Sequence, residues 1–323
     1  MAMDGAPLHR WRLDVARAFA GIPPTSDSGF FRRAALLGDG SLLALVQGMG
    51  LVRLDPDSRL VWRYAAPVFN DLWVSPDGGT ILLLVKRAVE RPELRAGGPV
   101  LEDFVVFLDG AGRELRRASL LAALERSRWR GLLTTLGPSA DVFHSNTIEV
   151  LGGAGTRDGG AFAAGNLLVS LREIDTVAML SADAGAVLWA QRGPYRAQHE
   201  PSLLPDGRLL LFDNLGRGAG RARVISVDPA SGAVAEEWLG PPGRALASRQ
   251  AGACRRLGNG NLLVVESERG AAWEIDGERR VVWEFRSPHR AGARRELVAA
   301  LLDLVRYEAP TPFLSRFARP QAP

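Results

Sequence analysis

The sequence contains little that would support a disulfide framework, a zinc site or a membrane span. It has one cysteine, Cys254, in 323 residues, so no internal disulfide can form, and no CxxC or HxxxH spacing occurs. The longest uncharged runs, such as 40–52, are about 13 residues long, whereas a membrane helix needs ~20 apolar residues. The first residues lack the basic-then-apolar pattern of a signal peptide. We therefore expect no metal site, no membrane span and a soluble chain as written. The compartment stays open, because a leader ahead of residue 1 would carry any export signal or membrane anchor.

Lysine is almost absent as well. Lys86 is the only one, which leaves 39 arginines among the 40 basic residues. Thirty-six acidic residues bring the formal net charge to +4. The arginines are scattered among the acids, whereas a nucleic-acid reader gathers them on one face. The excess therefore indicates a biased composition and a solvated surface, and we expect no nucleic-acid partner.

Glycine and proline are plentiful, at 36 and 20 residues, and favour a turn-rich β protein over a helical bundle. A turn such as Asp-Gly, followed by four or five apolar residues, recurs along the chain. The copies lie at 39–43, 77–81, 165–169, 206–210 and 259–263. Asp-Gly and Asn-Gly supply the positive φ angles of tight turns, and the apolar runs are typical of buried strands. The pattern predicts a series of β-hairpins.

A second pattern, a short strand that ends at or near a tryptophan, sets the repeat length. These strand ends fall at positions 11, 62, 115, 189, 238 and 283, so the intervals are 51, 53, 74, 49 and 45 residues. Periods of about 40 to 55 residues with four short strands each are typical of a β-propeller. The sequence therefore predicts an all-β, six-bladed β-propeller over 1–292 with a short first blade. The recurring tryptophans predict packing between blades.

Two helices are expected outside the blades. The longest interval must hold an insertion at about 119–138, where closely spaced leucines predict a short helix. A second helix is predicted at 294–307, within a C-terminal helix and tail over 293–323, because four apolar residues keep i, i+4, i+7, i+8 spacing. These residues are Leu297, Leu301, Leu304 and Val305. We expect this helix to pack against the propeller rim, with binding to a partner or to a membrane surface as the alternative.

The middle of the chain carries motifs more specific than a propeller repeat. The segments are 141–149, 165–172, 198–200 and 204–217. Their letters, Phe-His-Ser-Asn, Ser-Leu-Arg, Gln-His and Phe-Asp-Asn-Leu-Gly-Arg, resemble the motifs FHxN, SxR, QH and FDNG(x)GR of the bacterial arylsulfotransferases. That family consists of six-bladed propellers. The resemblance extends over about 8–307, through further matches at 256–263 and 281–285.

The resemblance implies a site in the central channel that transfers a sulfuryl group between phenolic compounds without a cofactor. In the family, a histidine nitrogen attacks the sulfur of an aryl sulfate, and a second phenol then takes the group from the sulfohistidine. The chemistry suits these residue types. An arginine fork matches two sulfate oxygens, and histidine exchanges protons near neutral pH. The implied partner is a small aromatic sulfate or another anionic small molecule.

Carried over residue by residue, the resemblance makes His199 and His144 the catalytic candidates, as nucleophile or acid/base. His199 matches the QH motif and His144 the FHxN motif. Arg172 and Arg217 would clamp the anion, although the loop before Arg217 is one residue shorter than in the family. The remaining substrate-binding candidates are Asn146, Asn214, Arg249 and Asn70.

Two positions depart from the family's pattern. Relatives take the nucleophilic histidine from a later blade, but no histidine occurs here between His199 and His289. His289 follows the last predicted strand. Asn70 stands where many relatives carry a histidine. The family mechanism therefore does not transfer intact.

Each candidate also has a structural alternative. His144 would bond strand-end backbone, Arg172 would form a buried salt bridge between blades, and Arg217 would be exposed in a glycine-rich loop. Asn214 would fix a turn. The leading function is sulfuryl transfer from an aryl sulfate to a phenol. The alternative is a non-catalytic propeller that binds an anionic ligand, or a protein through a propeller face or the C-terminal helix. A quinoprotein would need a metal site of Glu, Asn and Asp that the sequence does not reveal.

Overall fold

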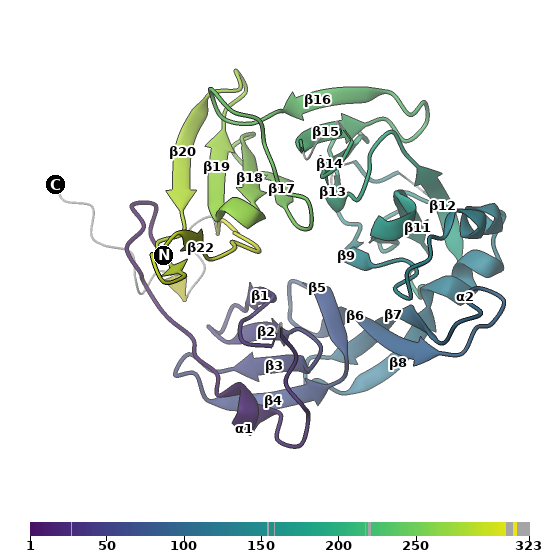
Figure 1. The fold of residues 1–323 in the computed structure, drawn as a ribbon, viewed down its shortest axis with the longest axis horizontal. Helices are drawn as coiled ribbons and strands as arrows, with labels where there is room; N and C mark the ends of the chain where they lie inside the picture. Colours follow the sequence, from purple (N-terminus) through teal and green to yellow (C-terminus); the bar gives the residue numbers. More distant parts are fainter. Residues whose placement is uncertain are drawn as a thin grey trace.

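The computed structural model describes residues 1–26, 28–153, 155–157, 159–216, 218, 221–307 and 313–314. These residues form a ring of five four-stranded sheets, the blades of a β-propeller (Figure 1). In every blade each strand pairs antiparallel with the next along the chain, and the first strand lies innermost. The fold class is therefore an all-β propeller, as predicted.

The blades follow one another along the chain. Blade one contains β1 (Arg33–Leu36), β2 (Leu42–Val46), β3 (Gly50–Leu54) and β4 (Leu60–Ala65). Blade two contains β5 (Val68–Val74), β6 (Thr80–Val89), β7 (Val100–Asp109) and β8 (Glu114–Ser119). Blade three contains β9 (Ser145–Val150), β10 (Leu167–Leu171), β11 (Thr176–Leu180) and β12 (Val187–Arg192). Blade four contains β13 (His199–Leu203), β14 (Leu209–Asp213), β15 (Arg223–Val227) and β16 (Val234–Trp238). Blade five contains β17 (Ala253–Arg256), β18 (Leu262–Glu266), β19 (Ala271–Ile275) and β20 (Val281–Arg286).

The repeated turns have the local chemistry that the sequence predicted. Gly40 has a φ of +86°, and the Asp39 carboxylate accepts the backbone N–H of Ser41 at 2.8 Å. This Asx turn presents the chain to β2, which is buried along its whole length. The apolar runs after the turns are thus the second strands of blades, buried on both faces because sheets pack on each side.

Tryptophans of the outer strands pack between blades, as predicted. The indole of Trp62 in β4 lies against Gly112 of blade two, where an added Cβ would stand only 2.6 Å from the ring. Trp238 of blade four and Trp273 of blade five have ring centroids 5.4 Å apart. These large apolar surfaces bury the joints between adjacent sheets.

The prediction of six blades is wrong. The motif at residues 8–11 belongs to no strand, and the only regular element among the described residues before β1 is the short helix α1 (Val15–Ala18). Trp11 instead packs on His9 and Phe313, with ring centroids 4.2 and 5.7 Å away. One strand-end motif cannot make a blade, because a blade needs four paired strands. Counting such motifs therefore overestimated the ring by one.

The predicted insertion helix is present and the predicted C-terminal helix is not. Residues 120–125 form α2 (Leu120–Glu125), capped by Ser119, whose Oγ accepts the N–H of Ala122 at 2.8 Å. A 3-10 turn, η1 (Arg130–Thr135), follows. Within 294–307 the only regular element is the strand β22 (Leu297–Val298), which pairs with β21 (Arg290–Ala291).

The C-terminal segment is extended because blade five provides a backbone hydrogen-bond acceptor and an apolar surface for it. The Leu301 N–H donates to the Ser267 carbonyl at 3.0 Å, and Leu301 and Leu304 pack on an apolar cluster of blade five. These contacts replace the internal hydrogen bonds of a helix, and the helical spacing of the apolar residues is coincidental. No helix in the described part of the chain is long and apolar enough to cross a membrane.

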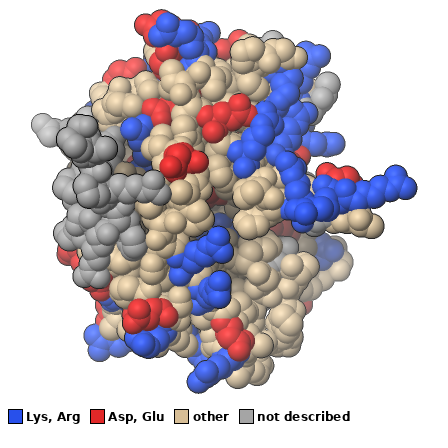
Figure 2. Space-filling view, turned by 90° about the vertical axis from the view of Figure 1, so that its left-hand side faces the viewer, with Lys and Arg blue, Asp and Glu red and all other residues tan. Residues whose placement is uncertain are grey.

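The two terminal segments lie between blade five and blade one (Figure 1). The Trp283 Nε1–H donates to the Met3 carbonyl at 2.8 Å, and the Leu36 N–H donates to the Tyr307 hydroxyl at 3.1 Å. A cavity of about 1260 Å³ remains there, lined by both segments and by β1. Figure 2 shows this side of the ring, whose middle is mostly uncharged.

Candidate functional site

The strand order brings most of the predicted site residues to one end of the propeller axis. The innermost strand of every blade is its first strand, so all five inner strands begin at the same end. The hairpin between the second and third strands of each blade lies at that end too. We call this end of the axis, marked by Asn70, His144 and His199, the His199 end. Arg172 lies there in a hairpin of blade three, and Arg249 in the approach to β17.

His199 is the best-defined of the candidates. It is buried at the start of β13, and its Nδ1 lies 2.8 Å from the Asn214 Oδ1 and 3.1 Å from the Ala197 carbonyl. The Asn214 amide nitrogen donates to the carbonyls of Ser248 and Ala251 at 2.8 and 2.9 Å. The Asn214 oxygen is therefore an acceptor, so the Nδ1 of His199 carries the hydrogen. Its Nε2 keeps a lone pair, and within the described chain no hydrogen-bond partner meets it.

The imidazole of His199 is neutral at physiological pH. Its pKa is lowered to about 3, mainly by burial; the nearby charges of Arg172, Arg32 and His144 act in the same direction, and the hydrogen bond to Asn214 opposes them. A neutral ring with an unprotonated Nε2 is the form that attacks an electrophile. Arg172 and His144 lie at the same end of the axis as His199, so their charges act on its ring.

His144 lies beside β9 in a left-handed conformation, with a φ of +46°. Its Nδ1 is 2.7 Å from the Asp141 Oδ2, and about a third of the side chain is exposed. Burial alone would raise the pKa of Asp141, but the hydrogen bond with His144 and the charge of Lys86 bring it down to about 2. Asp141 is therefore ionised, and it orients the ring of His144.

Two arginines line a small cavity at the His199 end. The cavity holds about 500 Å³ and is lined by Arg172, Leu215, Arg249, Gln250 and Glu268. Arg172 pairs with Glu173, but its Nε is buried without a hydrogen-bond partner among the described residues. The Glu268 carboxylate accepts the backbone N–H groups of Arg249 and Gln250 at 2.7 and 2.8 Å. The cavity thus combines two guanidinium groups with one carboxylate that already has donors.

The predicted asparagines join neighbouring inner strands. The Asn70 amide donates to the Ser145 carbonyl at 2.8 Å, and the Asn146 amide donates to the Gln198 carbonyl at 2.9 Å. Asn70 therefore ties blade two to blade three, and Asn146 ties blade three to blade four. With Asn214 they form a series of amide links around the His199 end. Arg217 lies outside the described residues.

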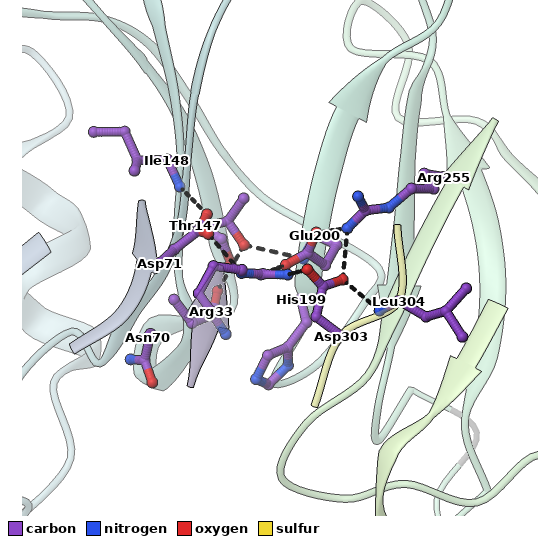
Figure 3. A network of polar contacts seen from close by, with 12 residues as sticks. Arg33, Asn70, Asp71, Thr147, Ile148, His199, Glu200, Arg255, Asp303 and Leu304 are labelled. Carbon is purple, nitrogen blue, oxygen red and sulfur yellow. Dashed lines mark hydrogen bonds and ion pairs between the residues drawn. The ribbon is translucent and has the colours of Figure 1, made fainter. Parts of the chain in front are cut away.

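A charged cluster on the axis escaped the sequence analysis. The buried guanidinium of Arg33 pairs with Asp71 at 2.8 Å, with Asp303 at 2.9 Å and with Glu200 (Figure 3). Arg255 pairs with Asp303 at 2.8 Å and with Glu200 at 3.4 Å. We call these five residues the axial cluster.

Every blade contributes to the axial cluster or to its hydrogen bonds. Blade three supplies the Ile148 N–H, which donates to Asp71 at 2.9 Å, and the Thr147 hydroxyl, which accepts the Glu200 N–H at 3.0 Å. In Figure 3 the imidazole of His199 lies to one side of the cluster. Among the described residues, no three or more His, Cys, Asp or Glu side chains are placed to hold a metal ion. Adjacency in the sequence was the only available signal, since Asp71 follows Asn70 and Glu200 follows His199.

Glu149 in β9 gives the axial region a measurable pH dependence. Burial, followed by the neighbouring carboxylates of Glu200 and Asp71, raises its pKa to about 7, against the opposing charge of Arg255. A raised carboxyl pKa means that the native state holds the proton more tightly than the unfolded chain. This contribution to stability is complete below the unfolded pKa of ~4.3 and is lost as pH rises through about 7.

We therefore expect Glu149→Gln to match the parent near pH 4 and to be more stable at pH 8. The full shift corresponds to about 3 kcal/mol. Because Glu149 keeps part of its surface in water, we expect a gain of about 1–2 kcal/mol. Urea unfolding at both pH values measures the difference. Asp77→Asn, at an exposed turn carboxylate, is the control and should show no such gain. Equal stabilities of Glu149→Gln and the parent at pH 8 would contradict the shift.

Comparison with known proteins identifies the family. The sequence model described as Arylsulfotransferase (ASST) matches residues 102–288, more than half of the chain. The chain belongs to the arylsulfotransferase family. The matched region covers blades three, four and five together with the outer strands of blade two, most of β7 and all of β8, and it includes both candidate histidines. No curated protein sequence matches the chain significantly.

The likeness of this chain to solved structures concerns the fold alone. A protein of unknown function from Bacteroides caccae is 17% identical, with a TM-score of 0.50 over 78% of this chain and 80% of that one. Virginiamycin B lyase from Staphylococcus aureus is 13% identical, with a TM-score of 0.47 over 82% of this chain and 72% of that one. At such identities the likeness says nothing about activity.

In this arylsulfotransferase-family chain, the register that His199 occupies in blade four is filled by an alanine in blade five. His199 in β13 pairs with Phe212, the penultimate residue of β14. In blade five the residue that pairs with the penultimate position of β18 is Ala253. A methyl group thus occupies the equivalent register, so His199 and His144 are the imidazoles available at this end among the described residues.

Proposed function

We propose that this protein transfers a sulfuryl group from an aryl sulfate to a phenolic acceptor at the His199 end of the axis. The observation that carries the proposal is the neutral His199, whose Nδ1–H is held by Asn214 and whose Nε2 meets no hydrogen-bond partner among the described residues. Arg172 lies close by, and the membership of the family supports the same chemistry. His199 is the nucleophile, and His144 is the acid and base.

The proposed reaction has two displacement steps. First, the Nε2 lone pair attacks the sulfur, the N–S bond forms, and the bond from sulfur to the aryl oxygen breaks. The departing phenolate takes a proton from the His144 imidazolium. Second, neutral His144 takes the proton of the acceptor phenol, whose oxygen attacks sulfur while the N–S bond breaks. Two steps of this kind replace one difficult displacement. The proton that His144 gives up leaves with the first phenol, His144 is neutral between the steps, and the acceptor phenol returns a proton to it.

Arg172 is assigned to the non-bridging sulfate oxygens, and this makes a prediction. We expect Arg172→Ala to raise the KM for 4-nitrophenyl sulfate about ten- to hundredfold, because a hydrogen bond to a charged group contributes about 1.5–3 kcal/mol. Initial rates over a range of substrate concentrations measure it. Arg59→Ala removes an arginine that is 74% exposed in blade one and should leave KM unchanged. An unchanged KM in Arg172→Ala would remove this arginine from the site.

Transfer from 4-nitrophenyl sulfate to phenol tests the proposed function. The parent should release 4-nitrophenol faster with phenol than without it, and without an acceptor it should gain the mass of one sulfuryl group on the peptide that contains His199. Binding of the aryl sulfate with neither release nor labelling would instead support the non-catalytic propeller. The Ala253 register is the observation that favours this alternative.

A further inference from the structure

The only lysine of the chain is buried next to the proposed site. Lys86 in β6 has a side chain that is 3% exposed, and its ammonium group pairs with the Asp141 carboxylate. The ammonium lies 5.0 Å from the centre of the Phe69 ring, in a cation–π contact. In a chain with 39 arginines, the one lysine thus occupies an interior position rather than the solvated surface.

Asp141 connects Lys86 to His144. Its Oδ2 is shared by the Lys86 ammonium and the His144 Nδ1, the latter at 2.7 Å. Its Oδ1 accepts the backbone N–H of His144 at 3.2 Å. One carboxylate therefore holds both the ring and the left-handed backbone of His144, and Lys86 is the cation that holds this carboxylate.

The surroundings of Lys86 suit an ammonium better than a guanidinium. Phe69 covers it, and the fully buried Asp103 lies close by, with its Oδ1 accepting from Ser145 and its Oδ2 without a partner among the described residues. An ammonium is a compact point charge, whereas a guanidinium is a wide plane with five donors to satisfy. The carboxylates of Asp141 and Asp103 and the ring of Phe69 enclose the ammonium closely, which leaves little room for a guanidinium plane.

We propose that Lys86 is a positioning residue for His144: through Asp141 it orients the imidazole and sets its proton affinity for exchange with the substrate oxygens. The Asp141 carboxylate places a negative charge beside the imidazole of His144, and the Lys86 ammonium offsets that charge. The role of the His144 proton in catalysis rests on the proposed function. The effect of Lys86 on the charge around His144 does not. The titratable groups around His144 also include Glu173, whose backbone N–H donates to the Phe143 carbonyl, and Asp103, which accepts from Ser145. The neutral His199 in β13 and the charged Arg172 in the blade-three hairpin lie at the same end of the axis.

The titration midpoint of His144, measured by NMR on the full chain without substrate, tests this inference. His144→Gln assigns the resonance among the four histidines. Lys86→Met should raise the midpoint by about one unit or more, because an uncompensated carboxylate beside an imidazole favours its charged form. Arg87→Met removes an exposed positive charge from the next position of β6 and should not change it. An unchanged midpoint in Lys86→Met would overturn the proposal.

A double-substitution cycle separates this effect from mere loss of a charge. In the Asp141→Asn background, Lys86→Met should shift the midpoint by less than half as much as in the parent, since the carboxylate that couples the two groups is gone. Equal shifts in both backgrounds would refute coupling through Asp141. If Lys86→Met does not fold, Lys86→Gln replaces it, and Asp141→Asn alone should lower the midpoint. If the His144 midpoint shifts as expected but the parent has no transferase activity, the proposed function is wrong and the coupling of Lys86 to His144 still holds.

Discussion

Replacement of His199 by alanine is expected to reduce the release of 4-nitrophenol from 4-nitrophenyl sulfate by at least ~10³-fold. The physical reason is that His199 supplies the attacking nitrogen, whereas His144, the other imidazole at this end of the axis in the described chain, is assigned to proton transfer. His144 has its Nδ1 on Asp141, and Ala253 occupies the equivalent register in blade five. The substitution should also abolish labelling of the peptide that carries residue 199.

His289→Ala is the matched control for this experiment. His289 is exposed and follows the last blade strand, so its loss should leave release and labelling unchanged. Asn214→Leu should lower the rate without abolishing labelling, because the His199 ring persists but its Nδ1–H loses the acceptor that selects the tautomer. Release that survives in His199→Ala would show that another group is the nucleophile.

The second large effect concerns stability rather than chemistry. We expect Arg33→Met to lower the free energy of unfolding by about 3–5 kcal/mol at pH 7, since removal of one partner leaves buried charge uncompensated. Three carboxylates, those of Asp71, Glu200 and Asp303, would lose their shared cation. Urea unfolding of the variant and the parent measures the difference.

The loss should shrink as the pH falls, because protonated carboxyl groups no longer need the guanidinium. Burial and the nearby carboxylates already raise the pKa of Asp71, so this recovery should begin above pH 4. Arg59→Met is the control: its ion pair with Asp57 is exposed on both sides, and such pairs contribute at most about 1 kcal/mol. If Arg33→Met lowered the free energy of unfolding by a similarly small amount, the axial cluster would not stabilise the ring of blades.

The hairpins and blades could be predicted because their interactions are local. Each strand pairs with the next along the chain, and an Asx turn such as that of Asp39 and Gly40 needs only three or four neighbouring residues. The number of blades is not local. Trp11 matches the strand-end pattern, yet its surroundings are His9 and Phe313, the latter from the other end of the chain. Nothing in the pattern at residues 8–11 reveals that neighbour.

The same distinction applies to the site. The motifs pointed to His199 and Asn214, which are 15 residues apart and meet across one β-hairpin. Arg33, in contrast, pairs with Glu200, which is 167 residues away. It also pairs with Asp303, which lies in the segment that was wrongly predicted to be a helix. Lys86 and Asp141 are 55 residues apart in adjacent blades. Such pairs form only when the ring closes.

The sequence and the tertiary structure therefore determined different properties of this protein. A single cysteine by itself excluded an internal disulfide. The turns and apolar runs indicated a β-propeller, and the motifs within 141–217 indicated the arylsulfotransferase family. Only the tertiary structure decided that the ring has five blades and that Arg33 joins carboxylates from three segments. It also placed the single lysine against the Asp141 carboxylate that holds His144. The reason is physical: turn geometry and strand burial depend on neighbours in the chain, whereas the environment of a buried charge depends on every blade that surrounds it.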